Sequence, residues 1–153
     1  MQTLNVGAGQ TEQEYAAAEQ QRRDDLRDES RSCANYFFWA AGLAAIGTGV
    51  LPLRLTFLVN IGTIDFLTFY GRSLGPLHPL LVMCAAGLWT FIIAGLGFAA
   101  RRGYRWAFLA GIALYGVDMI ALIITFSLWA FALHSFLVFK WYQGQKALKD
   151  LDE

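Results

Sequence analysis

Two ionisable residues, Asp118 and His134, lie inside long apolar stretches of the sequence. An ionised side chain within a bilayer costs about 3 kcal/mol or more unless it is paired, so such residues call for a structural or functional explanation. If the chain turns near Phe126, each residue lies eight positions from the turn, and both reach a similar depth. Tyr115 precedes Asp118 by one helical turn and is placed to join them. The spacing therefore predicts an intramembrane polar pair of Asp118 and His134, with Tyr115 beside it.

This polar group has three alternative roles. As a purely structural contact between two helices it would contribute about 0.6 kcal/mol and at most ~2 kcal/mol, which is the reading we favour. As a functional site it could instead relay protons or bind an ion, because intramembrane Asp and His residues serve proton-coupled transport. In the third role, the His134 ring ligates a pigment or haem.

The third role has one further cue in the sequence. Ala130 precedes His134 by four residues on an apolar helix. This spacing resembles that of bacterial antenna polypeptides, in which the histidine ligates bacteriochlorophyll and the small residue makes room for the ring. Antenna polypeptides have a single span, so the resemblance does not carry their function to this chain. A haem held by His78 and His134 is disfavoured because the two residues differ in depth by about 10 Å. The sequence thus requires no cofactor, although bound lipid is expected.

Other chemical signatures are missing from the sequence. It contains no Gly-x-Ser-x-Gly, no His-Glu-x-x-His and no phosphate-binding glycine loop. Its two cysteines, Cys33 and Cys84, form neither a Cys-x-x-Cys motif nor a metal-type spacing. We therefore expect a protein that is not an enzyme and holds no metal.

The composition indicates what kind of scaffold positions these residues. Hydrophobic residues make up 56 % of the 153 residues and charged residues 16 %, against roughly 45–50 % and 25 % in soluble domains. The charges are concentrated in 12–31, 101–105 and 140–153. The long stretches between them predict an all-α integral membrane protein, a four-transmembrane-helix bundle. The predicted spans are 34–53, 79–100, 106–124 and 126–142, with a hairpin near Thr125–Ser127 and the last span stopped by Lys140, Gln143 and Gly144.

The distribution of Lys and Arg predicts the orientation of these spans. Cytoplasmic loops collect positive charge, and a cytoplasmic N-terminus with four spans places ten of the twelve basic residues inside. Both termini are then cytoplasmic, most plausibly at a bacterial inner membrane. The apolar segment 55–70 becomes an interfacial segment outside, because a fifth span would move Arg101, Arg102 and Arg105 to the outer side. We expect these arginines to orient the chain, with contacts to lipid head groups as the alternative role.

Three regions follow from this pattern: a polar cytoplasmic tail or helix at 1–32, the transmembrane domain at 33–146 and a short cytoplasmic tail at 147–153. Small residues spaced four or eight apart predict close helix packing in the transmembrane domain, either within the chain or between chains. They are Ala41, Ala45 and Gly49 on the first span, Gly87 and Gly95 on the second, and Ala107 and Gly111 on the third.

These features favour a small non-enzymatic membrane protein. It would be an accessory or scaffold subunit of a larger membrane complex, or a homo-oligomer, with membrane lipids and other membrane-protein subunits as partners. The alternative is a proton- or ion-coupled transporter or channel that uses Asp118 and His134. A net charge of zero gives no indication of a nucleic-acid partner.

Overall fold

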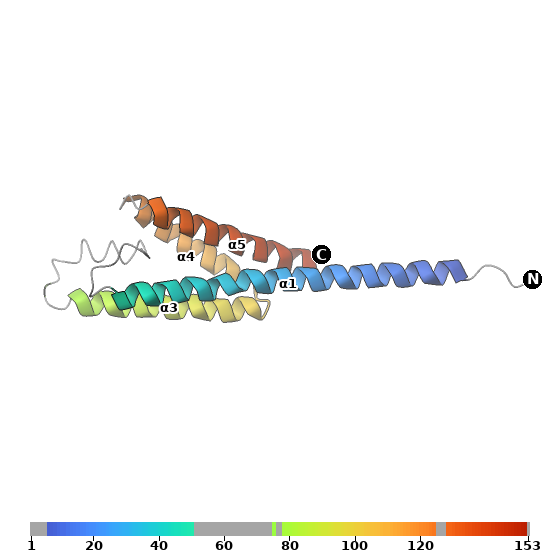
Figure 1. The fold of residues 1–153 in the computed structure, drawn as a ribbon, viewed down its shortest axis with the longest axis horizontal. Coiled ribbons are helices and arrows are strands. Elements are labelled where there is room, and N and C mark those ends of the chain that lie inside the picture. Colours follow the sequence, from blue (N-terminus) through green and yellow to red (C-terminus); the bar gives the residue numbers. More distant parts are fainter. Residues whose placement is uncertain (1–5, 51–74, 76–77, 125–127, 153) are drawn as a thin grey trace, which may run out of the picture.

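The computed structural model describes residues 6–50, 75, 78–124 and 128–152, with side chains described from residue 11 to 46 in the first range and from residue 80 onward in the third. The described residues form four α-helices: α1 (Val6–Val50), α3 (His78–Arg101), α4 (Arg105–Ile124) and α5 (Leu128–Asp152). Figure 1 shows them as an elongated bundle from which the N-terminal half of α1 projects. The protein is therefore all-α, as predicted.

Two of the helices are long and apolar enough to cross a membrane. These segments are Leu80–Arg101, with a mean hydropathy of 2.1, and Arg105–Ile124, with 2.2, and they match the predicted second and third spans. In each, only about a third or less of the residues (28 % and 33 %) are buried inside the chain, so most of their apolar surface points outward. Helices α1 and α5 instead join a charged half to an apolar half. The predicted interfacial segment 55–70 and the hairpin Thr125–Ser127 lie outside the described residues.

The helices alternate in direction. Helix α1 packs along both α3 and α5, and α5 packs along α4. The contact between α3 and α4 is the smallest of these four pairings. Helices α1 and α5 therefore make the most extensive contacts in the bundle. Helix α4 faces α1 across the centre of the bundle.

A seven-residue repeat of buried positions explains why α1 and α5 pack lengthwise. In α5 the buried residues include Ala130, Leu137 and Gly144 in one row and His134, Trp141 and Leu148 in the other. In α1 the row Ser30, Phe37 and Ala44 repeats at the same spacing. Alternating steps of three and four residues keep one stripe of a helix against its neighbour, as in coiled coils.

Aromatic rings fill the centre of the bundle and glycines make room for them. The Phe37 ring of α1 stacks on Trp141 of α5 with centroids 4.0 Å apart and planes at 7°. A Cβ atom added at Gly111 of α4 would lie 2.5 Å from the Phe37 ring, and one at Gly144 would lie 2.7 Å from the Cys33 Cβ. Gly97 of α3 is equally crowded by Phe37. At these three glycines a side chain of a neighbouring helix lies directly against the backbone.

Only some of the small residues that the sequence predicted to pack closely do so in the structure. Ala41, Ala107 and Gly111 are buried in the core, whereas Ala45 is exposed. Among the described residues nothing lies within 4 Å of a Cβ added at Gly87 or Gly95, so their face makes no close contact with the described helices. The surroundings of Gly49 lie outside the described side chains.

A tight turn connects α3 to α4. Gly103 has φ +85°, the left-handed conformation that glycine adopts without strain. The Gly103 N–H donates to the Ala100 carbonyl (2.9 Å) and the Tyr104 N–H to the Ala99 carbonyl (3.1 Å). This Schellman motif satisfies the last carbonyls of α3 and allows the chain to reverse. It positions Arg101, Arg102 and Arg105 at one end of the bundle.

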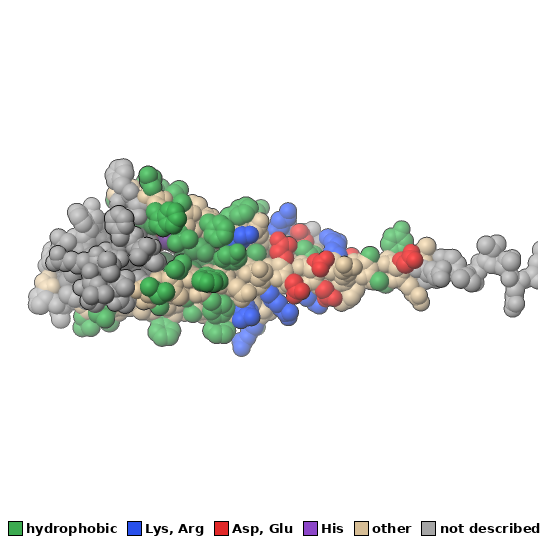
Figure 2. All heavy atoms as spheres, viewed as in Figure 1, with side chains coloured by type: hydrophobic (Ala, Val, Ile, Leu, Met, Phe, Trp, Pro, Cys, Tyr) green, Lys and Arg blue, Asp and Glu red, His purple; other side chains and the backbone are tan. Residues whose placement is uncertain are grey.

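The predicted region boundaries at residues 32 and 146 fall inside continuous helices. Helix α1 runs through residue 32 without a break, and α5 continues to Asp152, with Ala147 and Leu148 buried. Gly144 therefore does not end the fourth helix, because it is a packing contact and not a stop signal. Acidic and basic side chains gather where α1 leaves the bundle, and large apolar side chains cover the bundle itself (Figure 2).

Candidate functional site: a buried Asp–His pair between α4 and α5

Asp118 and His134 meet in the interior of the bundle. The Nε2 atom of His134 lies 2.8 Å from Oδ2 of Asp118. The exposed fraction of the whole residue is 0 % for Asp118 and 4 % for His134. Both lie in the buried rows of their helices, Asp118 one turn beyond Tyr115 on α4, and His134 one turn before Leu137 and two turns before Trp141 on α5. The helical stripes that build the core thus bring the two groups together.

The second ring nitrogen of His134 is also engaged. Its Nδ1 lies 2.8 Å from the backbone carbonyl oxygen of Ala130, one turn earlier in α5. A carbonyl oxygen only accepts hydrogen bonds, so Nδ1 carries a hydrogen. Nε2 then faces a carboxyl oxygen of Asp118, although the ring is not aligned for a straight hydrogen bond. A proton shared at this contact would leave the pair without net charge, as imidazolium with carboxylate or as neutral imidazole with carboxylic acid.

Aromatic rings surround the imidazole. Tyr115 stacks on His134 with ring centroids 4.6 Å apart and planes at 28°. Its ring also meets the edge of Trp141 at 4.7 Å and lies 6.3 Å from Trp89. Tyr115 thus contacts His134 through its ring face, where the sequence suggested a polar contact. A rigid aromatic wall holds the imidazole in one orientation.

This arrangement bears on the idea that His134 ligates a pigment or haem. An axial ligand donates a ring-nitrogen lone pair to the metal, and both nitrogens of His134 instead face oxygen atoms at 2.8 Å. Ligation would require one of these contacts to break inside a closed core. Among the described residues no group of three or more His, Cys, Asp or Glu side chains is placed to hold a metal ion.

The three arginines of the α3–α4 turn have different surroundings. Arg105 forms an ion pair with Asp152 of α5 at 2.9 Å. The guanidinium of Arg101 lies 5.7 Å from the centre of the Phe38 ring of α1. Arg102 is exposed. The turn is therefore tied to α5 by Arg105 and to α1 by Arg101.

The two cysteines lie apart. Cys84 is exposed on α3, and Cys33 is buried on α1 against Gly144. Burial raises the pKa of the Cys33 thiol, and the nearby Glu29 carboxylate raises it further. A thiol held protonated in this way is a poor nucleophile, which fits a packing role.

Sequence reasoning missed the residues that enclose the pair. Trp141 is fully buried and contacts both Phe37 and Tyr115, the ring that stacks on His134. Its position seven residues after His134, in the same helical stripe, is the signal that could have revealed it. The contact of His134 with the Ala130 carbonyl likewise follows from the i, i+4 geometry of a helix.

Comparison of the chain with known protein families, with curated proteins and with solved structures finds no match in any of the three.

Proposed function

We propose that this chain is a membrane-anchored accessory protein that presents a rigid, charged helical arm to a partner on the cytoplasmic side. The arm is residues 11–25, the part of α1 in which every side chain is exposed. The observation that carries the proposal is the continuity of α1 from Val6 to Val50, which makes the arm an extension of a helix packed in the bundle. In this proposal the four helices cross the bilayer and both termini are cytoplasmic.

The outer surface of the bundle supports the membrane anchor. Large apolar side chains are exposed on the outward faces of α3, α4 and α5, among them Phe91, Val117 and Trp129. Soluble monomers rarely expose contiguous apolar patches beyond a few hundred Å². The basic residues gather at one end, with the α3–α4 turn and the C-terminal half of α5 beside the charged part of α1. This distribution fits a bundle that stands in lipid with that end in the cytoplasm.

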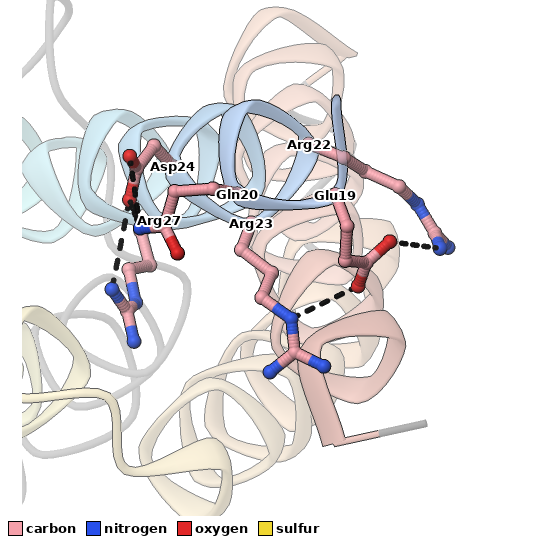
Figure 3. A network of polar contacts seen from close by, with 6 residues as sticks. All are labelled: Glu19, Gln20, Arg22, Arg23, Asp24 and Arg27. Atoms are coloured by element: carbon pink, nitrogen blue, oxygen red, sulfur yellow. Dashed lines mark hydrogen bonds and ion pairs between the residues drawn. The ribbon is translucent and has the colours of Figure 1, made fainter. Parts of the chain in front are cut away.

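The arm is stabilised by contacts within one helix. Glu19 pairs with Arg22 (3.7 Å) and Arg23 (2.9 Å), and Asp24 pairs with Arg27 (3.6 Å), as Figure 3 shows. Each acid precedes its base by three or four residues, the order that also suits the helix dipole. Because the packed half of α1 already supplies the helix nucleus, the arm only has to propagate it. A straight helix of 15 residues extends about 22 Å from its base.

The geometry of the Asp118–His134 pair supports a structural role in this proposal. The pair is buried, stacked against Tyr115 and formed between neighbouring helices. Such a contact fixes the register of α4 against α5, which an anchor needs. Under this reading the isolated chain is inert and acts through what the arm and the bundle bind.

Site-specific crosslinking tests the proposal. A photoreactive phenylalanine analogue would replace Tyr15, which lies on the arm and is 78 % exposed. We expect it to capture one partner in native membranes. The same analogue at Leu128, which is 83 % exposed at the opposite end of the bundle, should capture lipid or nothing.

A matched pair of variants completes the test. Ala17→Pro breaks the arm helix, at a local cost of about 3 kcal/mol, and should abolish the crosslink and the co-purified partner. Ala17→Ser keeps the helix and should retain both. If the Tyr15 position captures nothing and Ala17→Pro leaves the size of the native complex unchanged, the arm does not dock a partner and the proposal fails.

A second candidate function rests on the same buried pair. A carboxyl group and an imidazole placed 2.8 Å apart inside an apolar core are the arrangement that a proton-coupled transporter would use. Asp118→Asn preserves the size of the side chain and removes its ability to ionise. In liposomes with a proton-sensitive dye inside, this variant should abolish pH-driven flux without changing assembly. If the wild-type chain shows no flux, or the variant retains it, the transport candidate is excluded.

A further inference from the structure

A groove runs along the outer surface between α1 and the end of α3. It has a volume of about 480 Å³ and is lined mainly by apolar side chains of α1, with Arg101 of α3 as its one charged residue. The lining residues are Asn35, Phe38, Trp39, Gly42, Leu43, Ile46 and Arg101. Gly42 keeps the groove open, because nothing lies within 4 Å of a Cβ placed there.

Ion pairs distinguish Arg101 and Arg102 from the other arginines that the structure describes. On α1, Arg22, Arg23, Arg27 and Arg31 each have an acidic partner within 4 Å. Arg105 has Asp152. Within the described part of the chain, no ion pair involves Arg101 or Arg102. An arginine that lacks a protein counter-ion at the edge of an apolar groove is complementary to an anion with an apolar tail.

The length of the groove fits one leaflet of a bilayer. Asn35 and Ile46 are eleven residues apart on α1, which corresponds to about 16 Å along the helix axis. Half of a hydrocarbon core of about 30 Å is nearly the same length. Asn35 belongs to the charged end of the bundle, where Arg101 ends α3, and Ile46 lies deeper in the apolar half of α1.

We propose that this groove binds one anionic phospholipid. Its phosphate contacts the Arg101 guanidinium, which the Phe38 ring holds at 5.7 Å from its centre. The Asn35 amide donates to the head group or the ester oxygens. One acyl chain lies in the space above Gly42, between Trp39 and Ile46. This lipid would attach α3 to the half of α1 that continues into the arm.

Native mass spectrometry of the full chain in detergent tests the site. The probes are dioleoyl phosphatidylglycerol and dioleoyl phosphatidylcholine, which share their acyl chains and differ in net charge. We expect a single adduct of the anionic lipid, favoured about fivefold over the zwitterionic one, the size expected for one arginine near a membrane surface.

Two matched pairs of variants locate the site. Arg101→Gln should remove the fivefold preference, whereas Arg102→Gln, at the neighbouring exposed arginine outside the groove, should keep it. Gly42→Leu should fill the groove and reduce adducts of both lipids. Gly95→Leu, at another exposed glycine with no atom within 4 Å, should leave them unchanged. Neither leucine meets a neighbouring side chain at its Cβ, so both variants should fold, and their helix content is measured by circular dichroism.

The site is ruled out if both lipids bind equally to the wild-type chain, or if Arg102→Gln acts as strongly as Arg101→Gln. The inference rests on the proposed membrane anchor, and alkaline carbonate extraction of membranes separates the two. Release of the chain by carbonate contradicts the anchor itself. Retention of the chain without lipid selectivity contradicts the lipid site alone.

Discussion

Two contacts between an acidic and a basic residue, one in the arm and one in the core, have almost the same length and very different surroundings. Glu19 and Arg23 lie 2.9 Å apart, with side chains 48 % and 50 % exposed. Asp118 and His134 lie 2.8 Å apart, with side chains 0 % and 5 % exposed. In water the first pair is screened and contributes about 0.3–0.5 kcal/mol. In the core, solvent does not replace a lost partner. The contribution of each pair to stability therefore depends on its surroundings and not on its distance.

The two pairs also act over different spans of the chain. The arm pair joins residues four apart on one helix and can only support that helix. The core pair joins α4 to α5 across the turn between them and so fixes tertiary structure. Damage to the arm should stay local, and damage to the core should affect the whole bundle.

The largest expected effect comes from removing one member of the core pair. His134→Leu keeps a similar volume but leaves the Asp118 carboxyl without its imidazole partner in the core. We expect a loss of about 3–5 kcal/mol in the free energy of unfolding, measured by denaturant titration in detergent.

The double variant Asp118→Leu, His134→Leu is the control for this prediction. Replacing a whole buried pair with apolar residues is often close to neutral, so most of the stability should return. A double variant as unstable as His134→Leu would mean that shape, and not charge, decides the stability of this region.

Glycine substitutions compare packing in the core with an open helix face. Gly144→Ala places a Cβ 2.7 Å from the Cys33 Cβ and 2.6 Å from the Phe108 ring, so we expect a loss of about 1–3 kcal/mol. Gly95→Ala meets nothing within 4 Å and should stabilise its helix by up to about 1 kcal/mol. Thermal unfolding of both variants checks the opposite signs. Equal effects would show that α1 and α5 are farther apart at Gly144 than this structure has them.

The reactivity of the Cys33 thiol reports on the point along α1 where the charged half meets the packed half. Because burial raises its pKa, less thiolate is present at pH 8, and access is blocked as well. In a Cys84→Ser background, Cys33 should react with iodoacetamide at least about tenfold slower in the folded chain than after unfolding. The rate should rise as the pH is raised, because more thiolate forms. Rapid labelling at pH 8 would indicate that the bundle opens at this end.

The smallest expected effect is in the arm. Arg23→Gln removes one exposed ion pair and should lower global stability by less than about 0.5 kcal/mol, with the difference vanishing in 1 M salt. Unfolding at low and high salt measures it. A large, salt-independent loss would mean that the arm packs on the bundle and is not free to meet a partner.

Several features could be read from the sequence because they depend on local pattern. Charge-free stretches of about 20 residues predicted α3 and α4. The equal distances of Asp118 and His134 from a hairpin placed them at one depth, and the structure brings their side chains to 2.8 Å. The extent of α1 and α5 was harder to read, because composition changes at residues 32 and 146 while the helices continue.

The inner face of each helix could not be read in the same way. When a helix is apolar all round, its periodicity does not indicate which stripe faces its neighbours. Gly87 and Gly95 therefore looked as suitable for close packing as Gly111, yet only Gly111 meets another helix closely. For the same reason the sequence did not indicate that Trp141 is buried, because its ring is suited equally to an interface and to a core.

The sequence by itself determined the helical class, the two most apolar helices, the separation of charge from apolar surface and the positions of the two ionisable residues along their helices. These follow from the residue types and from the fixed rise of a helix. Only the tertiary structure decided which glycines admit Phe37 and Phe108, that both nitrogens of His134 are engaged, and that Arg101 lies at the end of a groove without a carboxylate beside it. Those outcomes depend on how the helices are rotated about their axes, and that rotation is set by contacts between residues far apart in the chain.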